Sequence, residues 1–357
     1  LAGGNVIENG LLAEKLQALA DGCRDIVYEL APAVPEQTIT VSNQPTGAFK
    51  PALMSSRAPA EPWWIASYSA LKTGAITMAV QQASDDQVAE EALGNQPKEI
   101  STTVFSRFNP GMHGFHRGAS AGTFLHSLLE WACKTGFALA ASNGEARLQQ
   151  IRSACEIRGW QDDVERLDHW LGGFISTTFT LDASTCINLS ELETCQPEME
   201  FLFATRPLVA TAIDTLCQQY LMPGAPRPEL QPARLNGMIK GFIDLVFEHE
   251  GRYYVADWKS NYLGPRDEHY TTDAMQQEVL KNRYEVQYAI YLLALHRLLR
   301  SRLPDYDYNT HVGGAVYFFL RGWQSHSQGI VFDRPPVEFI EALDQLFVHG
   351  SSDRRSA

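Results

Sequence analysis

The sequence predicts an α/β or α+β fold, in which the strands of a sheet are flanked by helices on both sides. Two strand-like runs joined by a short polar connection occupy residues 241–259. A run with helical periodicity follows over residues 268–302, and an apolar, strand-like run follows that over residues 311–320. With 357 residues, 45% of them hydrophobic and 10% aromatic, the chain is long and apolar enough to bury a sizeable core.

The N-terminal 62 residues predict a helix followed by a linker. A short amphipathic helix is expected within residues 11–30, where three leucines lie at helical spacing on one face: Leu12, Leu16 and Leu19. Six of the chain's 18 prolines fall between positions 32 and 62, so residues 31–62 are expected to be extended and largely unpacked. The chain has no initial methionine, and we expect it to be a fragment of a longer polypeptide.

A compact domain is expected to begin near Trp63. Its first expected elements are a helix around residues 67–71 and an acidic surface loop over 84–99. Residues 118–126 are then expected to lead into a helix through about Ala138, with Thr123 as its cap, and two helices are expected within 145–172. The expected later elements are a strand over 198–203, a helix over 207–220 and a closing helix over 337–348. Helices on both sides of the strand-like runs are the reason for the predicted fold class.

The hairpin at residues 241–259 carries the clearest chemical signal. Its connection, residues 248–251, is polar and contains glycine, as a short hairpin connection should. Side chains alternate between the two faces of a strand. Asp257 and Lys259 are therefore expected on one surface of the second strand, about 7 Å apart.

The first strand of this hairpin places Asp244 among apolar residues. Asp244 is expected to share a face with Phe242 and Val246. The opposite face is expected to hold Ile243, Leu245 and Phe247. A carboxylate in such a strand is costly to desolvate unless it has a partner or a metal ion. Two carboxylates and a lysine can hold a divalent cation and position a water molecule beside a phosphodiester, which is the chemistry of a metal-dependent nuclease.

A structural interpretation of the same residues stays open at this point. Asp257 and Lys259 can form a salt bridge at the rim of the sheet, and Asp244 can end its strand near solvent. For the spacing D-x(12)-D-x-K alone this interpretation is favoured, because such spacings often arise by chance. The surrounding order of strand, turn, strand and long helix favours the site.

Charge and composition exclude some classes of protein. The net charge of −13 argues against a protein that coats DNA by bulk electrostatics, although a nuclease with a local DNA channel fits it. No apolar run is long enough to span a bilayer and no signal peptide is present, so we expect a cytoplasmic protein without a membrane partner. Six scattered cysteines without a C-x-x-C pair predict buried free thiols in a reducing compartment rather than a zinc or iron–sulfur site.

Residues 101–129 contain no Asp or Glu but hold several basic side chains, namely Arg107, Arg117, His113, His116 and His126. This segment predicts either a phosphate-facing surface or a glycine-rich loop that happens to lack acids. His126 lies in a predicted helix, where a lone histidine is more often a packed or surface residue than a ligand.

Two further positions stand out on predicted elements. Glu198 and Glu200 share a face of the strand over residues 198–203. Gln287 lies within a helical stripe of mostly aromatic residues, namely Tyr284, Tyr288, Tyr291 and Leu295. A buried amide at Gln287 would require hydrogen-bond partners.

Five motifs together resemble the C-terminal nuclease domain of the RecB family, the β subunits of the bacterial helicase–nuclease exodeoxyribonuclease V. The motifs are Gly118-x(4)-Thr-Phe-Leu-His126, Glu198-Met-Glu-Phe201, Gly241-Phe-Ile-Asp244, Asp257-Trp-Lys259-Ser-Asn and Gln287-x(3)-Tyr291. The resemblance implies a restriction-endonuclease-like, PD-(D/E)XK α/β core with a mixed central sheet flanked by helices. It also implies that residues 1–30 are the C-terminal tail of a helicase region, 31–62 a linker, 63–350 the nuclease domain and 351–357 a disordered tail.

The same resemblance implies roles for the residues of the motifs. Asp244 and Asp257 would ligate Mg²⁺, with His126 and the backbone carbonyl of Trp258 as further ligands. Lys259 would orient or activate the attacking water and stabilise charge on the phosphate. Ca²⁺ is expected to bind without supporting cleavage.

The remaining motif residues would support this site. Glu198 matches the upstream acid of the family, with Glu200 as the alternative, and Gln287 and Tyr291 are expected to contact DNA or brace the site. The implied function is Mg²⁺-dependent hydrolysis of DNA by an exodeoxyribonuclease V-type enzyme, whose parent protein binds RecC-like and RecD-like subunits. The sequence has no Gly-x(4)-Gly-Lys-Ser/Thr loop, so no ATPase activity is expected within it.

Two other functions stay open from the sequence. One is a nuclease-dead scaffold on the same fold, which binds DNA or partner subunits without cutting. The other is a metal-independent partner-binding domain, in which the acids of the hairpin are structural.

Overall fold

The computed structural model describes residues 9–23, 26–29, 64–68 and 111–351. The chain divides into two compact units, residues 1–59 and 60–357. In the first unit, α1 (Asn9–Asp21) is the expected helix, but it ends before residues 26–29, which are not helical. Gly22 follows the last helical residue, and glycine commonly ends a helix at that position. The predicted linker over residues 31–62 lies outside the described residues.

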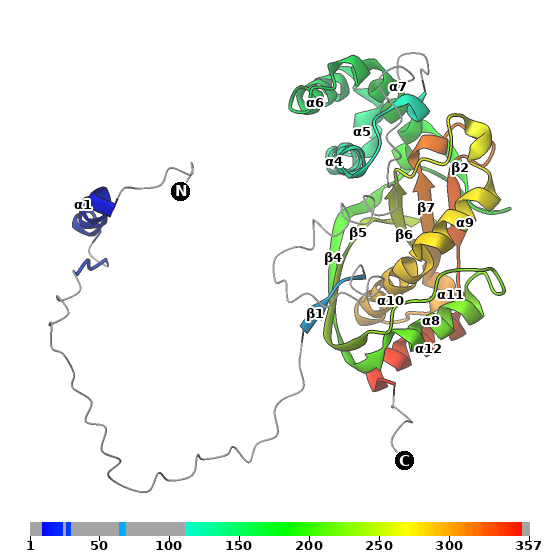
Figure 1. Cartoon of the computed structure of the whole chain (residues 1–357). Helices are drawn as coiled ribbons and strands as arrows, with labels where there is room; N and C mark the ends of the chain where they lie inside the picture. Colours follow the sequence, from blue (N-terminus) through cyan, green and yellow to red (C-terminus); the bar gives the residue numbers. More distant parts are fainter. Residues whose placement is uncertain (1–8, 24–25, 30–63, 69–110, 352–357) are drawn as a thin grey trace, which may run out of the picture. The chain divides into compact units, whose positions relative to one another are not determined.

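A six-stranded mixed sheet forms the centre of the second unit (Figure 1). Its strands are β1 (Trp64–Ala66), β4 (Thr194–Val209), β5 (Arg234–His249), β6 (Arg252–Lys259), β7 (Val312–Phe319) and β8 (Ile330–Asp333). The order is β1-β5-β6-β7-β8, and β4 pairs with β5. The β1–β5 and β6–β7 pairs are parallel and the other pairs are antiparallel. A separate two-stranded sheet joins β2 (Thr178–Thr180) and β3 (Cys186–Asn188).

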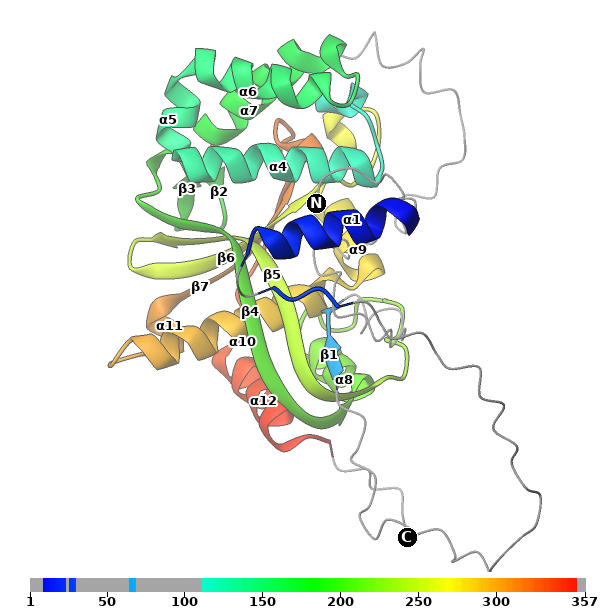
Figure 2. The same cartoon turned by 90° about the vertical axis from the view of Figure 1, so that its left-hand side faces the viewer.

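Helices cover both faces of this sheet, which confirms the predicted fold class (Figure 2). One layer contains α4 (Ala119–Thr135), α5 (Phe137–Ser142), α6 (Gly144–Glu156) and α7 (Val164–Ser176). The other contains α8 (Ala210–Tyr220), α9 (Thr272–Asn282), α10 (Tyr284–Arg302), α11 (Tyr308–His311) and α12 (Val337–His349). Along β6, Val255 packs in the core beside α10, whereas Ala256 and Trp258 pack in the core beside α4 and α7.

The predicted hairpin is present as β5 and β6. The turn itself is only two residues, Glu250 and Gly251, with φ angles of 51° and 77°. Two successive positive φ angles are the geometry of a type I′ turn, whose twist matches that of the strands.

The expected alternation along β5 breaks at Asp244. Leu245 packs in the core beside α4 and α7, but Ile243 packs in the same core as Val246, beside α10. The prediction that Ile243 shares a face with Leu245 is therefore wrong. The break occurs where β5 stops pairing with β6, since Leu245 opposite Ala256 is the last pair of their ladder.

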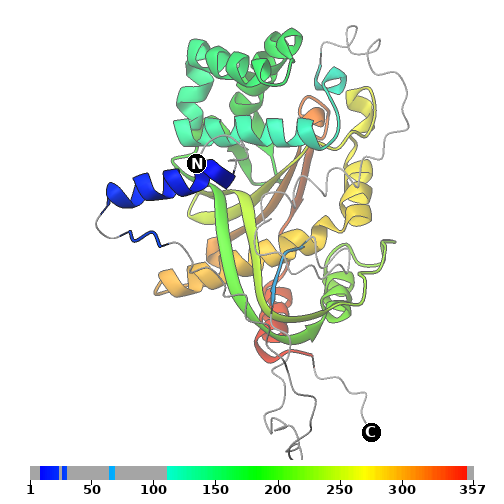
Figure 3. The same ribbon diagram turned by 60° about the vertical axis from the view of Figure 1, so that its left-hand side comes forward.

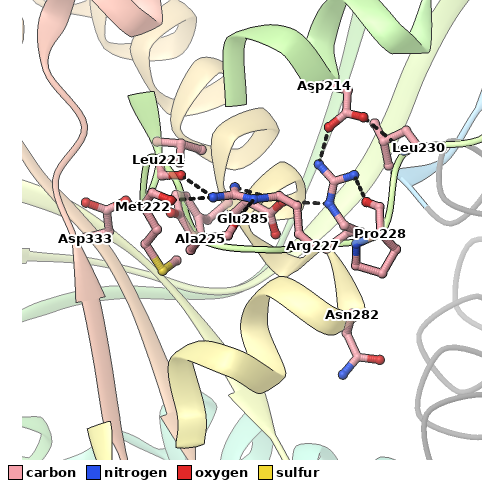
Figure 4. Close-up of polar contacts among 12 residues, drawn as sticks. Asp214, Leu221, Met222, Ala225, Arg227, Pro228, Leu230, Asn282, Glu285 and Asp333 are labelled. Carbon is pink, nitrogen blue, oxygen red and sulfur yellow. Dashed lines mark hydrogen bonds and ion pairs between the residues drawn. The ribbon is translucent and has the colours of Figure 1, made fainter. Parts of the chain in front are cut away.

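The predicted helix over residues 268–302 is two helices, α9 and α10, broken at Arg283. Arg283 adopts a left-handed conformation with φ of 61°, which is rare for an arginine. Its buried guanidinium bonds to Asp214 Oδ1 at 2.6 Å and to Glu285 Oε1 at 2.7 Å. Arg227 lies 3.4 Å from the same Glu285 oxygen and donates to the backbone carbonyls of Leu221 and Met222 (Figure 4). A buried cluster of two arginines and two acids thus holds the break.

The helix expected to reach Ala138 also ends early. Gly136, with φ of 93°, separates α4 from α5. The predicted cap at Thr123 is wrong: α4 begins after Gly118, and the Thr123 hydroxyl donates to the Ala119 carbonyl inside the helix. The helices expected within 145–172, 207–220 and 337–348 are confirmed as α6, α7, α8 and α12.

The cysteines agree only partly with the expectation of buried thiols. All six are free; Cys133, Cys155 and Cys217 are buried, whereas Cys23 and Cys186 are exposed. The loop expected over 84–99, and all but residues 67 and 68 of the helix expected over 67–71, lie outside the described residues. Within the described part of the chain, no helix is long and apolar enough to cross a bilayer.

Arg283→Ala is expected to destabilise the protein by about 3–5 kcal/mol, because it leaves Asp214 and Glu285 buried without their main cation. Lys281→Ala is the control, since the Lys281 side chain is exposed and its ammonium lies 3.2 Å from Glu278. That variant should change the free energy of unfolding by less than about 1 kcal/mol. Urea unfolding followed by circular dichroism measures both changes. Equal effects of the two substitutions would show that the buried cluster does not hold the helix break.

Candidate active site

The candidate site lies where β5 and β6 part. Beyond the last pair of their ladder, the Trp258 N–H donates to Asp244 Oδ2 at 2.8 Å instead of to a backbone carbonyl. This contact draws the Asp244 carboxylate toward β6, where its negative charge raises the pKa of Asp257. Both aspartates are buried, with exposed fractions of 3% and 1%. The alternative interpretation, in which Asp244 ends a strand near solvent, is therefore wrong.

Asp257 is held in an unfavourable environment for a carboxylate. Burial, and next the charge of Asp244, raise its pKa to about 7, although the nearby Lys259 opposes the shift. Its Oδ2 atom has no hydrogen-bond partner among the described residues. A buried carboxylate oxygen without a partner, beside a second carboxylate, is a fitting site for a hard divalent cation.

Lys259 lies on the same surface as Asp257, as the alternation of β6 predicts. Its Nζ is 2.7 Å from Asp257 Oδ1 and 3.1 Å from Gln287 Oε1. The ammonium also lies 4.0 Å from the centroid of the Tyr284 ring. The pair is not a rim salt bridge, because both side chains are at least nine-tenths buried.

His126 lies beside Asp244 and comes from α4, in the helical layer opposite the one that contains α10. Its Nδ1 is 3.4 Å from Asp244 Oδ2, and its side chain is 16% exposed. The other described histidines of residues 101–129 are engaged elsewhere: His113 bonds to Asp267 and His116 stacks on Trp160. Arg107 lies outside the described residues. His126 alone of the three histidines contacts an aspartate of the site.

The structure separates Glu198 from Glu200. Burial, and next the charge of Asp244, raise the pKa of Glu198 to about 7, with His126 opposing the shift. Glu200 is half-exposed and pairs with Lys240 at 2.7 Å. Glu198 has a positive φ of 47° at a point where β4 runs opposite Asp244, so the expected shared face of the two glutamates is broken there.

Gln287 and Tyr291 brace Lys259 from α10. Gln287 Oε1 accepts from Lys259 Nζ and from the Tyr317 hydroxyl at 2.9 Å, and Gln287 Nε2 donates to the Tyr291 hydroxyl at 3.0 Å. Tyr317, on β7 opposite Asp257, was not expected. The only signal for it in the sequence is a hydroxyl-bearing side chain in the otherwise apolar run of residues 312–319.

A cation at this site would be coordinated by few protein ligands. Within the described residues, no three side chains of His, Cys, Asp or Glu form a preformed metal-ligand cluster. Mg²⁺ usually keeps several water ligands and is held by one or two carboxylates, so Asp244 and Asp257 suffice in number. The ligand roles of His126 and the Trp258 carbonyl stay predictions.

Comparisons with known proteins show the family of the chain. Residues 106–352 match the family model described as the PD-(D/E)XK nuclease superfamily. The chain is 36% identical over 338 residues to the RecBCD enzyme subunit RecB of Escherichia coli (strain K12), which covers 93% of this chain and 27% of that protein. It is 35% identical over 252 residues to the RecB subunit of Haemophilus influenzae, covering 70% of this chain and 20% of that protein. The chain thus spans about a fifth to a quarter of the length of these curated relatives.

Asp257→Asn is expected to stabilise the metal-free protein at pH 8. Because burial raises the folded-state pKa of Asp257 from 3.8 to about 7, folding disfavours the ionised carboxylate, and stability is lost as the pH rises through this range. One pKa unit corresponds to about 1.4 kcal/mol, so even half of this shift amounts to about 2 kcal/mol.

Thermal unfolding in EDTA at pH 5 and pH 8 measures this effect. The gain from Asp257→Asn should be smaller at pH 5, and Glu200→Gln, which neutralises an exposed acid, should give little change at either pH. A lower melting temperature for Asp257→Asn at pH 8 would contradict the account of Asp257 as a destabilising buried charge.

Proposed function

Because the chain belongs to the PD-(D/E)XK nuclease superfamily, we propose that it is the nuclease domain of a RecB-like subunit and hydrolyses phosphodiester bonds of DNA with Mg²⁺. Members of this superfamily generally depend on a divalent metal. The observation that carries the proposal is Asp257 Oδ2, a buried carboxylate oxygen without a partner among the described residues, beside Asp244 and Lys259.

Each side chain of the site has a proposed task. Asp244 and Asp257 hold the metal, with the Trp258 carbonyl and His126 completing its protein ligands. When bound there, a divalent cation lowers the pKa of water and offsets charge on the phosphate. Lys259, fixed by Asp257, keeps its positive charge at the place where negative charge develops during hydrolysis.

Glu198 is the proposed acid–base group beside the metal ligands. Its pKa of about 7 suits proton exchange near neutral pH, since general acids and bases work best when their pKa lies near the working pH. Glu200, engaged with Lys240, is not needed for this task.

The parent protein is proposed to be larger than this chain, because the chain spans only about a fifth to a quarter of the length of its relatives. In this proposal residues 1–30 are the tail of a helicase region, residues 31–62 a linker, residues 63–350 the nuclease domain and residues 351–357 a tail. The relatives are named as subunits of the RecBCD enzyme. RecC-like and RecD-like partners, linear double-stranded DNA ends as substrate, and roles in recombinational repair and degradation of foreign DNA follow as parts of the proposal.

The second candidate function is a nuclease-dead module that binds DNA or partners on the same fold. The buried pair of Asp257 and Lys259, with the Glu198 carboxyl nearby, counts against it, because a scaffold has no use for charges that cost folding free energy.

The 357-residue chain is expected to degrade linear DNA with MgCl₂, and not with CaCl₂ or EDTA. Asp257→Ala and Lys259→Ala should each lower the rate by about 100-fold or more, while circular dichroism shows a folded protein. Agarose gels of end-labelled linear DNA over time measure the rate. Wild-type activity in the Asp257→Ala protein would refute the assignment; metal binding without any cleavage by the wild-type protein would favour the scaffold.

Glu198→Gln is expected to lower the DNA-degradation rate by roughly tenfold or more, because it removes a group that exchanges protons near neutral pH. Glu200→Gln, two residues away on the same strand, should leave the rate within about twofold of wild type. The same gel assay compares the two variants. The reverse order of effects would assign the role to Glu200.

A further inference from the structure

We propose that Tyr317 is a positioning residue for the reaction, which aims Lys259 by fixing the amide of Gln287. The inference rests on the proposed nuclease function and deepens it. It concerns a residue outside the five motifs and on a different strand from the carboxylates.

Tyr317 carries the only side-chain hydroxyl among the residues of β7. In the parallel ladder its partner is Asp257, so the two side chains lie on the same face of neighbouring strands. All eight residues of β7 are buried, and Tyr317 is 2% exposed. A buried tyrosine hydroxyl needs a hydrogen-bond partner. Tyr317 finds two acceptors across the layer on α10: Gln287 Oε1 at 2.9 Å and the Tyr284 carbonyl at 3.3 Å.

Two oxygens and two aromatic rings lie close to the ammonium of Lys259. The oxygens are Asp257 Oδ1 at 2.7 Å and Gln287 Oε1 at 3.1 Å. The rings are those of Tyr284 and Tyr317, with centroids 4.0 Å and 5.2 Å from Nζ. Aromatic faces attract a cation, and the attraction is stronger where water is excluded. Lys259 is therefore held as a charge in a fixed place, rather than as a mobile surface lysine.

The orientation of the Gln287 amide decides whether this arrangement around Lys259 works. An amide has an acceptor end and a donor end, and only the acceptor end can face an ammonium. Tyr317 donates to Oε1, while Tyr291 accepts from Nε2 at 3.0 Å. The Lys259 ammonium, which can only donate, requires Oε1 at its end of the amide, and the donation from Tyr317 to the same oxygen adds to the preference for this orientation. A carbonyl oxygen has two lone pairs, so it can accept from Tyr317 and Lys259 together.

Loss of the Tyr317 hydroxyl would remove one of the hydrogen bonds that Gln287 Oε1 accepts. Gln287 could then turn its amide, and the ammonium would keep Asp257 as its main oxygen partner. Lys259 would be drawn toward a carboxylate that the metal requires and away from the reacting phosphate. The expected defect lies in the chemical step and not in the binding of DNA.

Tyr317→Phe tests this inference, because the variant keeps the ring and removes only the hydroxyl. We expect kcat for DNA hydrolysis to fall about tenfold, while KM for DNA and the affinity for Ca²⁺, measured by calorimetry, stay within about twofold. Tyr308→Phe is the matched control: Tyr308 is also buried, and its hydroxyl bonds to the Pro335 carbonyl at 2.9 Å, away from Lys259. It should leave kcat unchanged.

A double-mutant cycle tests whether Tyr317 acts through Gln287. The variant carrying Gln287→Ala and Tyr317→Phe should be no slower than Gln287→Ala alone, because residues that act as a unit are not additive. The inference would be overturned if the fold-losses in kcat of the two single variants multiplied in the double variant, or if Tyr317→Phe left kcat unchanged. The proposed function would still stand in either case, provided that Asp257→Ala is inactive.

The side-chain amide of Gln287 gives a readout that does not depend on activity. In ¹⁵N NMR spectra its NH₂ signals should be protected from exchange in wild type and in Tyr308→Phe, and should lose protection in Tyr317→Phe. If the wild-type protein does not cleave DNA, the proposed function fails, and this readout still decides the positioning role. Retained protection in Tyr317→Phe would overturn it.

Discussion

The hydrogen bond from the Trp258 N–H to the Asp244 carboxylate is the contact on which the site depends. It replaces a rung of the β5–β6 ladder at the point where the two strands part. The Asp244 carboxylate accepts the hydrogen bond that a backbone carbonyl of β5 would otherwise accept. The Trp258 N–H is therefore still hydrogen-bonded, although β5 and β6 no longer pair at this position. As a result two buried carboxylates, from Asp244 and Asp257, lie close enough for the charge of one to disfavour the ionised form of the other. A divalent cation bound between them, as proposed, would offset both the cost of burial and the repulsion between the two carboxylates.

The second structural requirement is that α10 presents the correct residues to this point. Helix α10 is buried on nearly every side over its first three turns, so its rotation about its own axis is set by its start. That start is fixed by Arg283, whose left-handed backbone is held by Asp214 and Glu285. Figure 3 shows α10 in a helical layer separate from the one that contains α4. Tyr284 and Gln287 follow directly and meet Lys259. The buried ion cluster around Arg283 therefore sets the position of α10, and α10 in turn places Tyr284 and Gln287 beside the buried Lys259.

Much of this arrangement could be predicted from the sequence, because it follows from local periodicity. The alternation of β6 is enough to place Asp257 and Lys259 together, and the apolar setting of Asp244 indicates a need for compensation. What could not be predicted depends on non-local pairing. The break in alternation at Ile243 arises because β5 changes partners, and the left-handed Arg283 is stabilised by acids distant in sequence. Tyr317 was missed for the same reason: only the register of β7 against β6 places its hydroxyl near Gln287. The different surroundings of Glu198 and Glu200 depend in part on one positive φ angle that no pattern of residues indicates.

The most direct test of the central claim is the location of a divalent ion in crystals of the protein grown with MnCl₂. Anomalous scattering from Mn²⁺ distinguishes the ion from water. The account predicts an anomalous peak bound by carboxylate oxygens of both Asp244 and Asp257, with Lys259 Nζ still within hydrogen-bonding distance of Gln287 Oε1. No peak at these carboxylates under saturating Mn²⁺, with Asp257 paired only to Lys259, would contradict it.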